Sequence, residues 1–122
     1  MYFENTKDVI ISETNFIGNL QTNTNFLSSN VGFINSTFTD GKENHIRAID
    51  SDISLDGVTI ENSIDNDSEG HGVSCYNCLN VNIINSEFRN LTAFKSPAIM
   101  IQFAKGEEIN IMGSTFERNH AQ

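Results

Sequence analysis

A run of oxygen-bearing side chains that includes three carboxylates, DNDSEG, occupies residues 65–70. Oxygen ligands at alternate positions before a glycine are typical of loops that bind Ca²⁺. The candidate ligands are Asp65, Asp67 and Glu69. An EF-hand is excluded because its twelfth position, a bidentate glutamate, is Tyr76 here. Two alternatives remain: a looser calcium loop with Asp50 or Asp52 nearby, or a solvated acidic insertion, which is favoured. The sequence implies no other cofactor.

The only two cysteines, Cys75 and Cys78, form a Cys-x-x-Cys pair. A redox motif of this spacing belongs at a helix N-terminus in a thioredoxin-like setting, which the sequence does not predict. A zinc site would need two further ligands, and His45 and His71 are the nearby candidates. The remaining alternatives are a disulfide that pins a corner between two strands and a pair of half-buried thiols. A secreted setting favours the disulfide.

Three acceptor sequences for N-glycosylation occur, and they begin at Asn35, Asn66 and Asn90. Asn35 falls in a bend of the repeat described next, where it is expected to be enclosed. Asn66 and Asn90 are expected in loops between strands, where a glycan has room.

An internal repeat must position all of these residues. Its copies begin at residues 9, 31, 53, 81 and 109, so the spacings are 22, 22, 28 and 28 residues. Each copy starts with apolar residues at its first and third positions and ends its second short segment with phenylalanine or isoleucine. The second segments supply one predicted internal column, formed by Phe16, Phe38, Ile60, Phe88 and Phe116. The period of two predicts strands that turn these side chains to one face.

Two further sequence features belong to the predicted coil: the residue types at its bends and a third strand. Residues that tolerate a left-handed backbone stand at most of the bends, and glutamate is the poor fit among them. The bend residues are Glu13, Asn35, Gly57, Asn85 and Gly113. A third strand is predicted in the longer coils, at residues 46–49, 72–75 and 98–101. The segment 19–30 is polar and is expected to cover little of the open end of the solenoid.

The pattern therefore predicts an all-β fold, a right-handed single-stranded parallel β-helix of about five coils with three short strands per coil. A leucine-rich solenoid is excluded because its Leu-x-x-Leu-x-Leu pattern is missing. The whole chain, residues 1–122, is one predicted β-helix segment. Because no cap is visible at either end, we expect it to continue in a longer chain or to be covered by a partner.

The composition excludes several classes of function. The 122 residues include 16 Asp and Glu against 7 Lys and Arg, a formal net charge of −9. Nucleic acids and anionic membrane surfaces require a basic face, so neither is an expected partner. No run approaches the ~20 apolar residues that span a bilayer, so insertion of this segment into a membrane is not expected.

The segment from Asn77 to Asn90, NCLNVNIINSEFRN, resembles the repeat of pectin-lyase-like right-handed β-helix proteins. It is similar in particular to the Asn-Ser-x-Phe coils of polymorphic outer-membrane adhesins and of protist cell-surface β-helix proteins. The resemblance extends over about residues 7 to 119. The Gly-Gly-Ala-Ile motif of the adhesin repeat is present only in part, as Pro97-Ala98-Ile99.

Gly70-His71-Gly72 resembles a motif of the pectin-cleaving hydrolases on this fold. In those enzymes the catalytic acids lie on the preceding coil. The resemblance aligns that place with Asn44, His45 and Ile46 of this chain. Hydrolysis of a glycosidic bond needs two carboxyl groups, and none stands there. The sequence assigns no catalytic residue.

The expected function is that of a non-catalytic β-helix module of a secreted or cell-surface protein, used for adhesion, recognition or as a scaffold. Its expected partners are a protein or a glycan on the outer faces, and further coils or a capping chain at the ends. Two alternatives stay open: a fragment of a carbohydrate-active enzyme, and a capped structural subunit of a large assembly.

Overall fold

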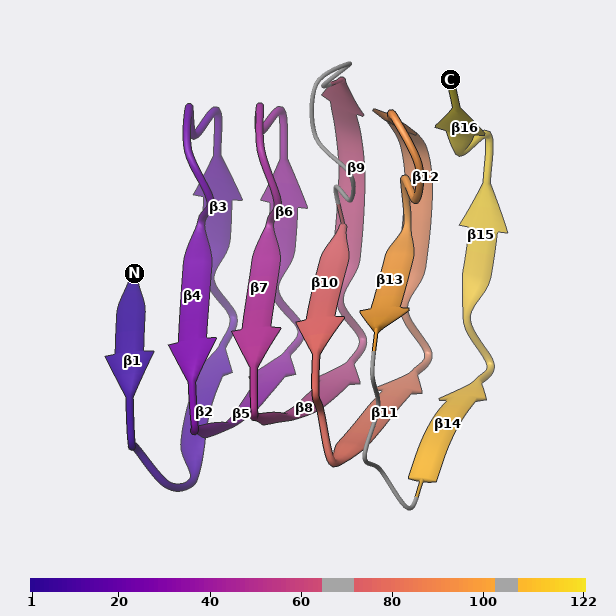
Figure 1. Cartoon of the computed structure of the whole chain (residues 1–122). Coiled ribbons are helices and arrows are strands. Elements are labelled where there is room, and N and C mark those ends of the chain that lie inside the picture. The colour runs from indigo at the N-terminus through magenta and orange to yellow at the C-terminus, as the bar shows by residue number, and fades with distance from the viewer. Residues whose placement is uncertain (65–71, 103–107) are drawn as a thin grey trace.

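The chain folds into a stack of short strands that runs from one terminus to the other (Figure 1). The structure, a computed structural model, describes residues 1–64, 72–102 and 108–122. Within these ranges every regular element is a strand. No helix that could cross a membrane occurs in the part of the chain that the structure describes.

The strands form three parallel sheets, which we name A, B and C in the order in which the chain meets them. Sheet A contains β1 (Tyr2–Glu4), β4 (Thr24–Leu27), β7 (Ile46–Ile49), β10 (Val73–Tyr76) and β13 (Ile99–Gln102). Sheet B contains β2 (Val9–Ser12), β5 (Asn30–Ile34), β8 (Asp52–Asp56), β11 (Asn80–Ile84) and β14 (Glu108–Met112). Sheet C contains β3 (Asn15–Ile17), β6 (Thr37–Thr39), β9 (Thr59–Ile64), β12 (Glu87–Ala93) and β15 (Thr115–Glu117), with β16 (His120–Ala121) also paired to β12.

This arrangement confirms the predicted all-β fold, a parallel β-solenoid with three strands per coil. The chain makes about four full turns and, in its described residues, passes each sheet five times. The register joins the five copy starts in one line, because Val31 pairs with Val9 and with Ile53, and Val81 pairs with Ile53 and with Ile109. The insertions that lengthen the later copies therefore leave the strand pairing unchanged.

The third strand is present in every coil, not only in the longer ones. The first coil has β1, and the second has β4, which lies in the segment 19–30, where no strand was predicted. Phe26 of β4 is buried and stacks on Phe3 with ring centroids 5.5 Å apart. The polar neighbours concealed the strand: Thr24 is also buried, and its hydroxyl donates to the carbonyl oxygen of His45.

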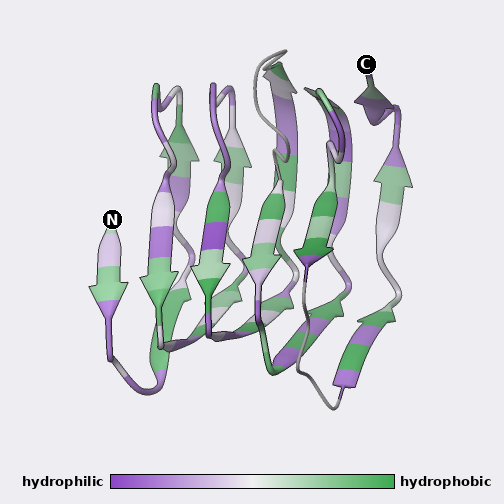
Figure 2. Cartoon of the chain, in the orientation of Figure 1, coloured by the Kyte–Doolittle hydropathy of each residue, from purple (hydrophilic) through white to green (hydrophobic). Residues whose placement is uncertain are grey.

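The predicted aromatic column lies inside the solenoid. Phe16 stacks on Phe38 at 4.5 Å between centroids, and Phe88 stacks on Phe116 at 4.9 Å. Ile60 pairs with a phenylalanine on each side and is fully buried. Figure 2 shows hydrophobic and hydrophilic residues alternating along the strands. Alternate residues of a strand face opposite sides, so the hydrophobic ones share the inner side.

All five predicted bend residues adopt a left-handed backbone at the corner between sheets B and C. Their φ angles are 50° at Glu13, 47° at Asn35, 63° at Gly57, 49° at Asn85 and 59° at Gly113. Glutamate thus takes the conformation that its type disfavours, since the stacked coil fixes the corner whatever residue occupies it. Residues at the other two corners, such as Asp50 and Asn62, also have a left-handed backbone.

A hydroxyl group follows the left-handed residue at many corners and links successive coils. Ser36 Oγ accepts the N–H of Thr14 in the preceding coil at 3.2 Å and donates to the carbonyl oxygen of Ile34 in its own coil at 3.0 Å. Ser86 and Ser114 repeat this pattern two and three coils later. Each hydroxyl satisfies one buried N–H and one carbonyl group where the strand ladder is interrupted.

Candidate functional site

The outer face of sheet B carries a hollow with a volume of ≈ 460 Å³. Strands β2, β5, β8 and β11 supply its lining. The lining residues are Asp8, Val9, Ile10, Asn30, Val31, Gly32, Phe33, Ile34, Asp52, Ile53, Ser54, Asp56, Asn80 and Asn82.

The floor of the hollow is set by Gly32. In register across the outer face, Gly32 lies between Ile10 and Ser54. A Cβ atom at Gly32 would meet nothing closer than the carbonyl oxygen of Ser54 at 3.9 Å, and the residue has no positive φ. Neither the backbone conformation nor a close neighbour therefore requires glycine here. The missing side chain leaves an apolar depression beside Ile10, which is 68% exposed, and Ile34.

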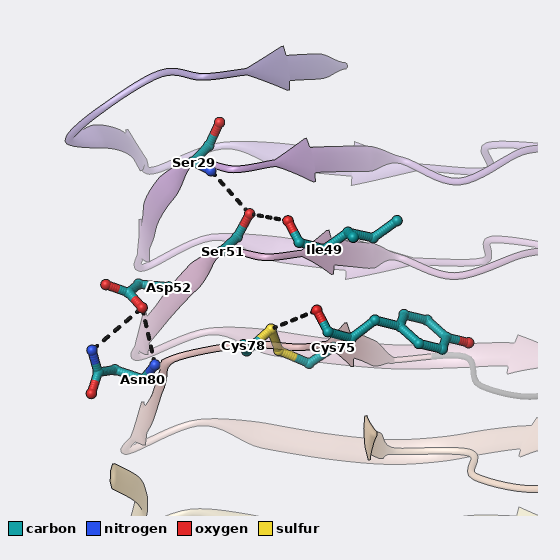
Figure 3. The surroundings of a disulfide bond; sticks show 8 residues. Ser29, Ile49, Ser51, Asp52, Cys75, Cys78 and Asn80 are labelled. Carbon is teal, nitrogen blue, oxygen red and sulfur yellow. Dashed lines mark hydrogen bonds between the residues drawn. A yellow bond between two sulfur atoms is a disulfide. The ribbon is translucent and has the colours of Figure 1, made fainter. Parts of the chain in front are cut away.

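Carboxylate and amide groups form the rim. Asn30, Asp52 and Asn80 occupy one position of three successive strands. Asp52 Oδ1 accepts the backbone N–H of Asn80 at 3.0 Å and its side-chain amide at 3.3 Å (Figure 3). Asp8 and Asp56 also line the hollow. These bonds hold Asp52 and Asn80 side by side, and the strand spacing sets the row at about 4.8 Å per strand.

A second hollow continues the first toward the C-terminal end of the same face. Its volume is ≈ 370 Å³, and it shares Asn80 and Asn82 with the first. Glu108 and Asn110 extend its rim, and the Asn110 side chain donates to Asn82 Oδ1 at 3.2 Å. We name the two hollows together the sheet B groove. It runs along the stacking axis, across the strands.

The chemistry of the sheet B groove suits binding. Among the described residues its lining combines an apolar floor with four carboxylates and several amides, and it includes no lysine, arginine, histidine or cysteine. In a chain of net charge −9, such a lining attracts cations. The outer face of sheet C differs, because Arg89 contacts Glu61 at 2.6 Å and Glu87 at 3.2 Å. The hydrogen bond that Arg89 donates to Glu61, and then the negative charge of Glu61, raise the pKa of the Arg89 guanidinium.

Cys75 and Cys78 form a buried disulfide at the corner between sheets A and B, with Cα atoms 5.9 Å apart (Figure 3). Cys75 points into the core at the level of Ala48. Cys78 follows Tyr76 by two residues, as Ser51 follows Ile49, and it therefore replaces a corner hydroxyl. A zinc site with His45 does not form in these described residues, since both sulfur atoms are joined to each other.

A buried polar cluster surrounds His45, and no pattern in the sequence indicates it. The ring nitrogens Nδ1 and Nε2 lie 2.6 Å from the side-chain nitrogen of Asn23 and 2.6 Å from Ser63 Oγ. The order of the three groups resembles a catalytic triad, but all three residues are buried. Ser63 Oγ also accepts the N–H of Gly41 and donates to the carbonyl oxygen of Glu61. The cluster therefore serves as a corner link between coils.

Several of the remaining candidate residues are not described by the structure. Asp65, Asp67, Glu69, Asn66 and His71 lie outside the described residues, so the calcium loop and one glycan acceptor remain predictions. No group of three residues that could hold a metal ion occurs in the ranges that are described. Asp52, a possible additional ligand of that loop, accepts a hydrogen bond from the backbone N–H of Asn80.

Two details of the glycan acceptors differ from expectation. Asn35 is exposed at its bend, where enclosure was expected, because the coils leave the left-handed corner at the surface. Asn90 lies within β12 rather than in a loop, since this strand runs through the corner at a left-handed residue. Asn90 is also exposed, and its amide donates to Asn62 Oδ1 at 3.0 Å.

Gly72, the last residue of the Gly-His-Gly motif, has a packing role. A Cβ atom there would collide with the carbonyl oxygen of Ala98 on the next coil and would lie 3.3 Å from Phe88 Cδ1. The N–H of Gly72 donates to Pro97, and its carbonyl oxygen accepts from Ile46. The close approach of two coils explains the glycine without a catalytic role.

In its described residues the chain is a parallel β-solenoid that carries an elongated groove on the outer face of sheet B. Comparison with protein-family models, with curated proteins and with solved structures gives no match. The function of the chain is therefore inferred from its own geometry.

Proposed function

We propose that the chain is a non-catalytic recognition module of a secreted or cell-surface protein, and that the sheet B groove holds an extended, cationic segment of a partner protein. The observation that carries this proposal is Gly32. The fold does not require glycine at this position, yet its absence of a side chain opens the apolar floor beneath a carboxylate rim.

The groove suits an extended peptide because its polar groups repeat with the strands. Asn30, Asp52 and Asn80 lie at successive steps of about 4.8 Å. Positive side chains along a peptide could meet the carboxylates of Asp8 and Asp56 while apolar side chains cover the floor. Charge complementarity of this kind mainly gives specificity and fast association, and the apolar floor adds buried area.

A Gly32→Val substitution tests the proposal, with opposite expected effects on binding and stability. We expect an approximately tenfold weaker binding of a synthetic peptide that alternates lysine and leucine, equivalent to about 1.4 kcal/mol. We also expect the free energy of unfolding to rise by about 0.5–1 kcal/mol, since glycine inside a strand is unfavourable. Fluorescence anisotropy measures the first quantity and urea unfolding the second.

The matched control is Thr37→Val on the outer face of sheet C, which should leave peptide binding unchanged. A peptide that alternates glutamate and leucine should not bind to either protein. Equal binding of the lysine peptide to the parent chain and to Gly32→Val would overturn the proposal. Preferential binding of a neutral cello-oligosaccharide would assign the groove to a glycan instead.

The secreted or cell-surface setting is supported by the buried Cys75–Cys78 pair and by the exposed acceptors Asn35 and Asn90. For the natural protein we expect no free thiol and at least one glycan. Intact mass under non-reducing conditions, with glycan mapping, measures both. Reduced cysteines together with bare acceptors would contradict this setting and favour a subunit inside a cellular assembly.

A further inference from the structure

Carboxylate and amide groups alternate along one edge of the sheet B groove. At the start of the five sheet B strands the register forms a row in the order Asp8, Asn30, Asp52, Asn80 and Glu108. All five residues line the two hollows. A carboxylate therefore recurs at every second strand of the row, about 9.6 Å from the next one, since neighbouring parallel strands lie about 4.8 Å apart.

The opposite edge of the groove is mostly apolar. Its row, at the other end of the same strands, contains Ser12, Ile34, Asp56, Ile84 and Met112. Ile34 is 39% exposed, and the depression left by Gly32 lies between the two rows. A segment that lies along the groove thus meets three surroundings: the polar row on one side, the apolar row on the other, and solvent above.

The polar row has groups available for a ligand. Both hydrogen bonds that Asp52 accepts from Asn80 end on Oδ1, so Oδ2 remains for a cation. Asp8 and Glu108 are exposed. The exposed amide of Asn30 lies between two carboxylates and can bond a peptide carbonyl group.

The repeat lengths of regular peptide conformations distinguish the possible occupants. A polyproline II helix has three residues per turn and a rise of 3.1 Å, so every third side chain recurs on one side after about 9.3 Å. In a β-strand the side chains of one face recur after about 6.8 Å, and two turns of an α-helix span about 10.8 Å. Only the polyproline II repeat agrees with the carboxylate spacing to within about 0.3 Å. Its three rows of side chains also match the three surroundings.

We propose that the sheet B groove binds a partner segment in the polyproline II conformation, with lysine or arginine at every third position. This inference rests on the proposed recognition function and adds the conformation and the charge spacing of the partner. The cationic row contacts Asp8, Asp52 and Glu108, and a second, apolar row covers the floor at Gly32. The intervening amides bond the backbone of the segment, which makes no hydrogen bonds of its own.

Two peptides of identical composition test the spacing. The first has four Lys-Leu-Pro repeats, in which proline favours the extended conformation of the preceding leucine. The second has the same residues with the lysines moved in pairs to its two ends. Because charge, length and proline content are equal, only the register differs. Fluorescence anisotropy should show about tenfold tighter binding of the repeat peptide to the parent chain.

A charge-conserving exchange in the protein provides the second arm. The double substitution Asn30→Asp with Asp52→Asn keeps the net charge and moves the central carboxylate by one strand, about 4.8 Å. Binding of the repeat peptide should weaken by about fivefold, as expected for one exposed ion pair. Binding of the paired peptide should stay the same. Circular dichroism verifies that the exchanged chain is folded, and the comparison of the two peptides on the parent chain needs no variant.

The outcomes separate this inference from the recognition function. Equal binding of the repeat and paired peptides to the parent chain would overturn the inference and leave the recognition function standing. Tighter binding of the alternating lysine–leucine peptide than of the repeat peptide would do the same, since it would indicate a strand-like occupant. Absence of binding by all three peptides would overturn both.

Discussion

Phe38→Ala should lower the free energy of unfolding by about 3–5 kcal/mol, the usual cost of removing a fully buried phenylalanine. Phe38 is fully buried in the inner column, between Phe16 and Ile60. Its ring lies 4.5 Å from Phe16 and 5.3 Å from Phe33, measured between centroids. Because the total stability of a domain is about 5–15 kcal/mol, this one change should bring the chain close to unfolding. Urea denaturation followed by circular dichroism measures the loss.

The matched control for this prediction lies in the same column. Phe116 stacks on Phe88 but is 46% exposed, so Phe116→Ala should lower the free energy of unfolding by only about 1–2 kcal/mol. Equal losses for the two variants would contradict the placement of Phe38 inside the solenoid and of Phe116 at its end.

Gly72→Ala should lower the free energy of unfolding by about 3 kcal/mol, since overpacking against rigid backbone forces the coils apart. The added Cβ would collide with the carbonyl oxygen of Ala98, an atom that is fixed in the strand ladder by the N–H of Val73. Thermal unfolding should show the loss as a lower midpoint.

Gly32→Ala is the control for Gly72→Ala, because it adds the same methyl group where the nearest atom is 3.9 Å away. It should leave the midpoint unchanged or raise it slightly. A Gly72→Ala variant as stable as Gly32→Ala would remove the packing explanation of Gly72. The Gly-His-Gly motif would then need a functional explanation.

The coil pattern could be predicted because every coil repeats the same environment. The inner column from Phe16 to Phe116 and the bend from Glu13 to Gly113 stand at fixed positions of each copy, so five weak signals support one another. Glu13 could be assigned to a left-handed bend although glutamate disfavours that conformation. The apolar residues of its copy align with those of the other copies in a single register, and this register places Glu13 at the bend.

Strand β4 was not predicted because a hydropathy pattern does not show that polar side chains are buried together with their hydrogen-bond partners. Thr24 and Asn23 lie inside the second coil, where they bond His45 of the third. Those bonds join residues 21 and 22 positions apart, and no local pattern indicates them. The same reason hid the cluster of His45 and Ser63.

The sheet B groove could not be predicted because its shape depends on side-chain sizes in adjacent coils. Gly32 resembles any strand glycine along the sequence, and only the pairing with Ile10 and Ser54 shows the hollow that it leaves. The row of Asp52 and Asn80 likewise combines residues that are 28 positions apart.

The most direct test of the proposed recognition function is a map of backbone amide shifts in a nuclear magnetic resonance titration of the chain with the lysine–leucine peptide. The account predicts that the largest shifts occur on the outer face of sheet B, at Ile10, Gly32 and Ser54, and extend to Asn82. Shifts confined to sheets A or C, or none at a peptide excess, would contradict it.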